Sequence, residues 1–350
     1  MHTTLPARQI RSLLAADLAT SASVASCWEA VFRSTARNTY VLSTDGPREL
    51  GRLTAIQGLA CDNADDIEAV LANGTIVTAS KAQNPDLWWA LRGGGNQFAI
   101  ITNLKLQAHP AGDNGKIWGG IRTYHPSKRK ALFKAITNFV RDYPDAKAAV
   151  IPTFQFGAPL NLINLIGSGP LFFFFYDGAE PPKDVFADFD AIEATKDDTG
   201  TKSYWELTNE AGGAAPLPGF SASFRENTFP NMQDEQMADF YEEMWQKVSA
   251  QSFVSSVALD VKIMGFDPQP VSVRIARVSI AQGGNALGLD PDHGDRIWVE
   301  NNYLWANPMC DDNCPKASKR VMQSVHDYHV KNYANVTPTN YKSGDPSFVK

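Results

Sequence analysis

From residue 64 to residue 80 the chain alternates apolar and polar positions around an Asn-Gly pair. Ile67, Ala69 and Leu71 alternate before Asn73-Gly74, and Ile76 begins a second alternating run. Two short alternating runs joined by Asn-Gly are typical of a β-hairpin. The pattern predicts two antiparallel strands with a type I′ turn, because both central residues tolerate positive φ.

A short helix is predicted directly after this hairpin, followed by a third strand. Asn84 suits the N-cap, Pro85 suits the first helical position, and Gly93 suits a left-handed helix end. The apolar face of this helix comprises Leu87, Trp88 and Leu91. Residues 98–106 then alternate again, with Phe98, Ile100, Thr102, Leu104 and Leu106 on one side. The glycines therefore follow a helix and open a strand, the reverse of the dinucleotide-binding G-x-G-x-x-G arrangement.

Beyond Pro110 predicted strands and helices alternate along the chain. The strands are expected at 117–124, 148–156, 169–178, 270–280 and 295–306, and the helices at 127–143, 181–192, 234–251 and 317–334, with a short helix and a loop at 203–213. Because these strands are long and hairpin-like, we expect an α+β fold with helices covering an antiparallel sheet. The patterning divides the chain into a poorly patterned segment 1–50, domains at 51–112 and 113–310, and a C-terminal helix and tail at 311–350.

Composition narrows the function classes. The 350 residues are 43% hydrophobic and 20% charged, with a net charge of −6, which is typical of a globular domain. The longest basic run is Ser127 to Lys130, so no nucleic-acid partner is expected. No apolar run has the length of a membrane span, so no membrane partner is expected either.

The cysteines and the N-terminus leave alternatives open. Cys310 and Cys314 suit a small disulfide loop or half of a metal site, and no second ligand pair with zinc spacing follows. We therefore expect no metal. Residues 1–27 have the order of a secretory signal peptide, but Asp17 interrupts the apolar stretch. The secretory pathway and the cytoplasm both remain open.

Residues 58–110 carry a family resemblance. The segment NPDLWWALRGGGNQFAIIT, together with the preceding VLANG, resembles fungal FAD-linked oxidoreductases of the vanillyl-alcohol-oxidase/berberine-bridge-enzyme type. Looser similarity continues to about residue 310. The resemblance implies that 51–112 is the second part of a PCMH-type FAD-binding domain and that 113–310 is a substrate domain. FAD is the implied cofactor.

In that family the glycine loop and the following strand pass against the flavin, because glycine permits close backbone approach. The resemblance makes seven residues candidates for cofactor binding: Gly93, Gly94, Gly95, Asn96, Phe98, Ile100 and Thr102. Without the resemblance, the same glycines are explained by a helix end and a tight connection to a strand. Ala99 stands where the family usually has glycine.

The first part of the family's FAD domain is not recognisable. Residues 1–50 hold no glycine cluster, and His2 is the only histidine before His109. We therefore expect a chain truncated at both ends relative to the family. A partner chain is one way to cover the incomplete domain.

The resemblance implies oxidation of a small-molecule secondary metabolite by an FAD-dependent oxidase or dehydrogenase. On the strand 296–305, Glu300 and Asn302 share one face and Tyr303 lies on the other. Glu300 and Tyr303 are the candidate catalytic residues, although a solvent-facing or ion-paired Glu300 fits the pattern too. The alternative function is a non-redox relative, acting as a binding protein or cofactor-free cyclase, or an inactive fragment.

Overall fold

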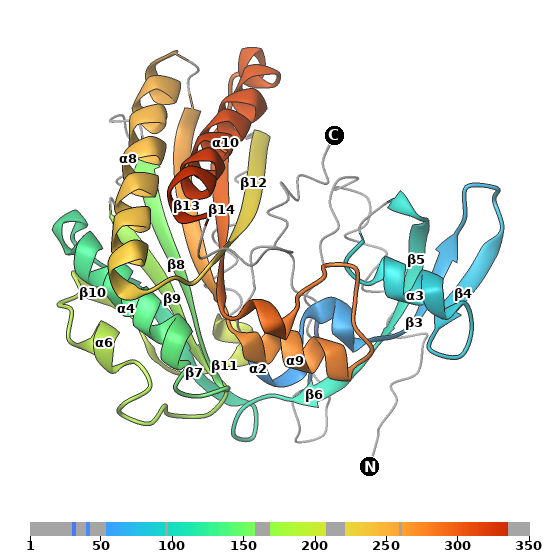
Figure 1. Ribbon diagram of the computed structural model, residues 1–350. Helices are drawn as coiled ribbons and strands as arrows, with labels where there is room; N and C mark the ends of the chain where they lie inside the picture. The colour runs from blue at the N-terminus through green and yellow to red at the C-terminus, as the bar shows by residue number, and fades with distance from the viewer. Residues whose placement is uncertain are drawn as a thin grey trace.

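The computed structural model describes residues 30–32, 40–42, 54–94, 97–157, 169–207, 221–258 and 261–334 (Figure 1). The predictions for residues 1–27 and for the tail after residue 334 lie outside the described residues, and so do Gly95 and Asn96.

The predicted strand–strand–helix–strand unit is confirmed. Strands β3 (Ala64–Val70), β4 (Ile76–Ser80) and β5 (Ile100–Leu106) form an antiparallel sheet in the order β4-β3-β5. Helix α3 (Pro85–Leu91) covers one face of this sheet. Trp88 and Leu91 pack there against Ile67 and Ala69, and the indole of Trp88 donates to the carbonyl of Ala64 at 2.9 Å.

The hairpin turn differs from the predicted type I′. Gly74 has φ 82°, whereas Asn73 is not in the left-handed region. The Gly74 amide donates to the Leu71 carbonyl at 2.9 Å, so one left-handed glycine is enough to close the loop. Asn84 also departs from its predicted role: its own φ is 50°, and its side-chain amide donates to the carbonyl of Thr78 rather than capping α3.

Strand β5 does not keep a single apolar face. Ile100 and Thr102 are exposed, whereas Ile101, Leu104 and Leu106 pack against the core under α3. The pairing of β3 with β5 shifts register between Glu68 and Ala69. A register shift of one residue reverses which side chains face the core, and this explains the departure from simple alternation.

A large antiparallel sheet forms the second layer of the molecule. Its strands are β7 (Lys116–Thr123), β8 (Ala148–Gly157), β9 (Pro170–Tyr176), β10 (Lys196–Asp197), β11 (Gly200–Ser203), β12 (Ser221–Pro230), β13 (Val261–Val271) and β14 (Arg296–Trp305). The order is β10-β7-β9-β8-β13-β14-β12, with β11 also paired to β7. Helices α4 (Arg129–Asp142), α8 (Asp234–Ala258) and α10 (Asn313–Tyr333) cover one face (Figure 1). The predicted α+β class is confirmed.

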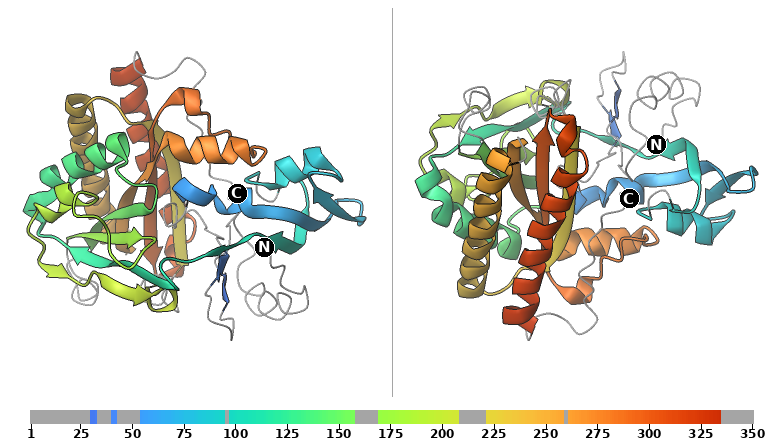
Figure 2. Two further views of the ribbon diagram at one scale, coloured as in Figure 1. Left: turned by 90° about the horizontal axis from the view of Figure 1, so that it is seen from below. Right: turned by 90° about the horizontal axis from the view of Figure 1, so that it is seen from above.

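The remaining elements are short and connect these layers. They are β1 (Ala30–Phe32), β2 (Tyr40–Leu42), β6 (Ala108–Pro110), α2 (Thr54–Gln57), α6 (Ala187–Asp190), α9 (Val273–Ala281) and the 3₁₀ turns η1 (Ala60–Asn63), η3 (Pro126–Lys128), η4 (Pro291–His293) and η5 (Pro308–Cys310). Strands β1, β2 and β6 form a third sheet. Helices α2 and α9 lie side by side between the large sheet and the β3–β5 sheet (Figures 1 and 2).

The strand predicted at 270–280 is wrong, because most of this segment is helix α9. Ser272 caps the helix by accepting from the Arg274 amide, and Ile275, Ala276 and Ser279 form its buried face. Their spacing is helical, which outweighs the β propensity of the valines and isoleucines.

The sequence also predicts no strand at 261–271, where β13 lies. Pro268 and Pro270 argue against a strand there. Both prolines are tolerated because β13 pairs with β8 only from Ile263 to Phe266. Beyond Phe266 no backbone amide of β13 is needed for hydrogen bonds to β8, so the missing N–H of proline costs nothing on that side.

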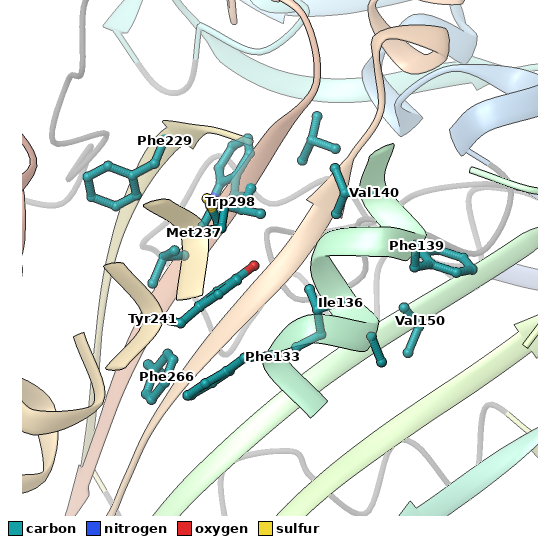
Figure 3. Packing of buried hydrophobic residues seen from close by; sticks show 14 of the residues in the cluster. Phe133, Ile136, Phe139, Val140, Val150, Phe229, Met237, Tyr241, Phe266 and Trp298 are labelled. Carbon is teal, nitrogen blue, oxygen red and sulfur yellow. The ribbon is translucent and has the colours of Figure 1, made fainter. Parts of the chain in front are cut away.

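Aromatic side chains dominate the core between the large sheet and its helices (Figure 3). The rings of Phe133 and Tyr241 stack with centroids 4.9 Å apart, and those of Phe154 and Phe266 at 5.1 Å. The predicted stripe of α8 is confirmed, with Met237, Phe240, Tyr241, Met244 and Val248 fully buried and Trp245 partly buried. Burial of these large rings is the main contribution to stability of this layer.

Three further findings concern the cysteines, metal binding and membrane spans. Cys310 and Cys314 form a disulfide, so the first of the two sequence interpretations is confirmed. Among the described residues, no group of three His, Cys, Asp or Glu side chains is arranged to hold a metal ion. Within the same ranges, no helix combines the length and the apolar character that crossing a bilayer requires.

His329 makes the stability of the large domain depend on pH. Its ring lies among Phe229, Phe240 and Tyr333, and Nε2 has no hydrogen-bond partner among the described residues. Burial, assisted by His326, lowers the pKa of His329 to about 4. The unfolded chain therefore binds a proton that the folded chain lacks between about pH 4 and 6.5, and stability falls as the pH drops through that window.

We expect this single group to lower the free energy of unfolding by about 2 kcal/mol between pH 7 and pH 5. Denaturant titrations at the two pH values measure the loss. His329→Phe removes the titrating group among aromatic neighbours and should flatten this part of the pH dependence, whereas His125→Gln at an exposed position should not. An unchanged pH dependence in His329→Phe would contradict the assignment.

Candidate functional site

The first described glycine of the RGGG segment fits against another part of the same chain. Gly93 ends α3 with φ 89°, as predicted. A Cβ on Gly93 would lie 2.6 Å from Cγ of Leu287, which belongs to the second glycine-rich segment, 283–289. The Ala286 amide donates to the carbonyl of Arg92 at 2.8 Å, so the two segments are joined by a backbone hydrogen bond.

Gly94 is enclosed within its own loop. A Cβ there would lie 2.1 Å from the Ala90 carbonyl oxygen and 2.8 Å from the ring of Phe98. The Gly94 amide donates to the same Ala90 carbonyl. Glycine is thus required at both described positions for packing within the chain, and neither requirement depends on a cofactor.

Arg92 is the centre of a buried polar cluster. Its side chain is fully buried, and its guanidinium lies 4.0 Å from the ring centroid of Trp88. Nε donates to the Cys61 carbonyl at 2.8 Å, and Nη2 donates to the backbone carbonyl and to Oδ1 of Asp62, both at 3.1 Å. Burial lowers the pKa of Arg92, and the Asp62 carboxylate acts in the opposite direction.

The same Asp62 carboxylate binds helix α9 and the segment after it. Oδ1 accepts from the Ser279 hydroxyl at 3.0 Å and from the Asn285 side-chain amide at 2.7 Å. Oδ2 accepts from the Leu59 amide at 2.9 Å. Neither Asp62 nor its partners Ser279 and Asn285 were among the candidate residues from the sequence, because a separation of up to 223 residues leaves no local pattern.

The start of β5 offers an exposed apolar surface. Phe98 is 47% exposed and Ile100 is 71% exposed. Thr102 is also exposed, and its hydroxyl donates to Oε1 of Glu68 at 2.8 Å. Exposed apolar residues of this size beside a glycine loop fit contact with a flat ring system such as a flavin.

The phosphate end of FAD needs a different kind of contact. Arg92 does not fit that role, although it adjoins the glycines, because its guanidinium is buried and its donors are taken by Asp62 and by backbone carbonyls. The described residues of the loop therefore fit the ring of a flavin rather than its pyrophosphate.

Three carboxylates lie at adjacent register positions on the large sheet. Glu300 of β14 pairs with Glu226 of β12 on one side and with Asp267 of β13 on the other. Directly paired residues point to the same face of a sheet, with Cβ atoms about 5 Å apart. Glu300 is only 2% exposed, so the alternative of a solvent-facing glutamate is wrong.

Neighbouring side chains orient the two outer carboxylates. The Asn302 side-chain amide donates to Oδ2 of Asp267 at 3.0 Å, and the indole of Trp298 donates to Oε2 of Glu226 at 3.2 Å. Carboxylates in such a sheltered row are able to accept a proton from a bound molecule, which is the property required of a general base.

The two candidate catalytic residues lie on opposite faces of β14. Tyr303 is fully buried and packs with Cys314 and Ala317 of α10. Burial raises the pKa of Tyr303, and the Ser255 hydroxyl of α8 acts in the opposite direction. Tyr303 thus contacts α10, while Glu300 lies on the opposite face of β14.

Comparison with known proteins finds fungal relatives of the chain. No protein-family model matches the chain. It is 29% identical over 281 residues to the FAD-dependent monooxygenase drtC of Aspergillus calidoustus, a match that covers 79% of this chain and 50% of that protein. It is 28% identical over 295 residues to an uncharacterized FAD-linked oxidoreductase of Arthroderma benhamiae, covering 82% and 54%. The chain is a relative of the fungal FAD-linked oxidoreductases.

The fold of this fungal FAD-linked oxidoreductase relative is found in solved structures of low sequence identity. A VAO-type flavoprotein from Myceliophthora thermophila superimposes with a TM-score of 0.59 at 17% identity, covering 97% of this chain and 60% of that one. BBE-like protein 28 of Arabidopsis thaliana gives a TM-score of 0.58 at 14% identity, covering 92% and 70%. The vanillyl-alcohol-oxidase/berberine-bridge-enzyme fold predicted from residues 58–110 is confirmed.

The chain spans about half the length of the curated relatives it matches. FAD is the cofactor named for those relatives, in agreement with the sequence prediction. The assignment of individual binding and catalytic residues remains a prediction.

Proposed function

We propose that this chain carries the substrate face and the ring-contacting loop of an FAD-dependent oxidoreductase that oxidises a small-molecule secondary metabolite. The similarity to FAD-linked relatives along about four-fifths of the chain supports the class of reaction. The observation that carries the proposal for this site is the buried Glu300, flanked in register by Glu226 and Asp267 on the sheet face opposite α10.

When bound, FAD would supply the hydride acceptor for this oxidation. The exposed Phe98 and Ile100 would provide an apolar surface for its ring. Glu300 accepts the proton that leaves the substrate hydroxyl or amine as the hydride departs, so the substrate loses two electrons and two protons in balance. Asn302 holds Asp267 beside Glu300 and contributes a polar contact that orients the substrate.

The first test is the absorbance of the purified protein, before and after addition of FAD and after acid treatment. We expect the absorbance bands of oxidised flavin, and acid treatment then shows whether the flavin is released or stays bound to the protein. The variant Ile100→Glu places a charge on the proposed ring surface and should abolish retention of FAD. Because Ile100 is 71% exposed, the protein should remain folded. A wild-type protein that stays colourless with excess FAD would refute the proposal.

A second candidate function is a non-redox relative that binds a small molecule on the same sheet face. One observation favours it: Gly93 and Gly94 are both required by packing within the chain. A protein without flavin that nevertheless binds small molecules in an Asn302-dependent manner would support this second function.

A further inference from the structure

Two glycine-rich segments, far apart in sequence, form one packed unit. The segment 92–94 ends α3, and the segment 283–287 follows α9. A Cβ on Gly283 would lie 3.2 Å from the ring of Trp88 and 3.6 Å from Nη1 of Arg92. Together with the contact of Gly93 on Leu287, this means that small residues on both sides allow the two backbones to approach.

Arg92 is the side chain that joins the two segments. Nη1 donates to the carbonyl of Gln282 at 3.3 Å, and the Arg92 carbonyl accepts from the Ala286 amide. The other donors of the guanidinium are directed at Cys61 and Asp62. The planar guanidinium of Arg92 therefore joins the C-terminal end of α3 to residues 61–62 and to Gln282 at once. The ammonium group of a lysine lacks the fixed set of donors that this requires.

Helix α9 carries this restraint to strand β14. At its C-terminal end, Ser279 is bound to Asp62. At its N-terminal end, the Val273 amide donates to Oδ1 of Asp295 at 2.7 Å, and Asp295 immediately precedes β14. Glu300 lies five residues further along the chain. A nine-residue helix held at both ends thus connects the Arg92 cluster with the strand that bears Glu300.

Arg92 also restrains Phe98, through the glycine loop that follows it. Arg92 immediately precedes Gly93 and Gly94, and the Phe98 ring rests against Gly94. The side-chain amide of Gln97 also donates to the Gly94 carbonyl at 3.3 Å. The position of the exposed Phe98 ring is therefore set by the same loop that Arg92 holds.

We propose that Arg92 is a positioning residue that holds the Phe98 loop in register with helix α9 and the Glu300 strand, rather than a ligand of a cofactor phosphate. This proposal rests on the proposed function, because the position of Phe98 relative to Glu300 matters for activity only if FAD binds there. Its structural part, the coupling of residues 97–99 with residues 282–289 through Arg92, stands independently of whether FAD binds.

The test compares Arg92→Lys with wild type and with Arg129→Lys. Arg129 is a matched control, because its guanidinium also holds two elements together, α4 and α8, through Glu242 at 2.6 Å. A second variant, Asp62→Leu combined with Arg92→Met, removes both buried charges with apolar replacements, which proteins often tolerate without loss of stability. This variant keeps the test decisive if the lysine variant alone unfolds.

Hydrogen exchange of the protein without FAD is the first readout. Both the Arg92→Lys and the double variant should exchange about tenfold faster at residues 282–289 and at residues 97–99 together, because their shared restraint is lost. Arg129→Lys should leave both segments unchanged. Faster exchange at only one of the two segments, or at neither, would overturn the coupling.

The affinity for FAD is the second readout, with the melting temperature measured alongside. We expect the Kd for FAD to rise about tenfold to a hundredfold in Arg92→Lys at a nearly unchanged melting temperature, since small misplacement of a binding group has effects of that size. An unchanged Kd despite coupled exchange would overturn the positioning role. If wild type binds no FAD, the proposed function fails, and hydrogen exchange alone decides whether the coupling holds.

Discussion

Replacing Glu300 by glutamine is expected to lower the rate of substrate oxidation by a factor of about 10²–10⁴. Glutamine has the shape of glutamate and keeps a polar group at this buried position, but it accepts no proton. Because the loss concerns proton transfer, the affinity for FAD should stay within the wild-type range. The measurement is the anaerobic bleaching of the flavin by a substrate found in a panel of alcohols and amines.

The control for this experiment is Glu242→Gln. Glu242 is a carboxylate on α8 that pairs with Arg129, on the helix side of the sheet. We expect this variant to bleach at the wild-type rate. If Glu300→Gln also bleaches at the wild-type rate over a range of pH, Glu300 is not the base, and Glu226 or Asp267 becomes the residue to replace next.

Asp62→Ala is expected to lower the free energy of unfolding by about 3–5 kcal/mol, because it leaves the Arg92 charge buried without its partner. Both side chains of the pair are fully buried, and Nη2 lies 3.1 Å from Oδ1. The hydroxyl of Ser279 and the amide of Asn285 lose an acceptor in the same variant. Equilibrium unfolding in denaturant at neutral pH measures the change.

An exposed ion pair provides the comparison. Asp234→Ala removes the partner of Arg141 at 2.6 Å, where both side chains are about half exposed to water. Exposed pairs of this kind contribute about 0–1 kcal/mol, so this variant should remain close to wild type. Equal effects of the two substitutions would show that the Asp62 cluster does not contribute as a buried pair.

The patterned segments of the chain were predictable because their information is local. Helix α8 and helix α3 each bury one face, and that requirement imposes a period of 3.6 on the sequence. The failures share a different origin. Segment 270–280 was predicted as a strand because of its β-branched residues, and β13 was not predicted because of Pro268 and Pro270. In the first case the helical spacing of the buried residues outweighs β propensity, and in the second case pairing in the assembled sheet does.

By itself the sequence determined the α+β class, the resemblance to FAD-linked oxidoreductases and the glycine loop between α3 and β5. Only the tertiary structure decided what the loop touches: Leu287 lies against Gly93, and Arg92 is sequestered by Asp62. It also decided that Glu300 lies in register between Glu226 and Asp267, whereas Tyr303 packs with α10. The reason is physical. Periodicity records which side of an element is buried, but which distant segments meet there depends on how the layers pack, and local sequence carries no signal of that contact.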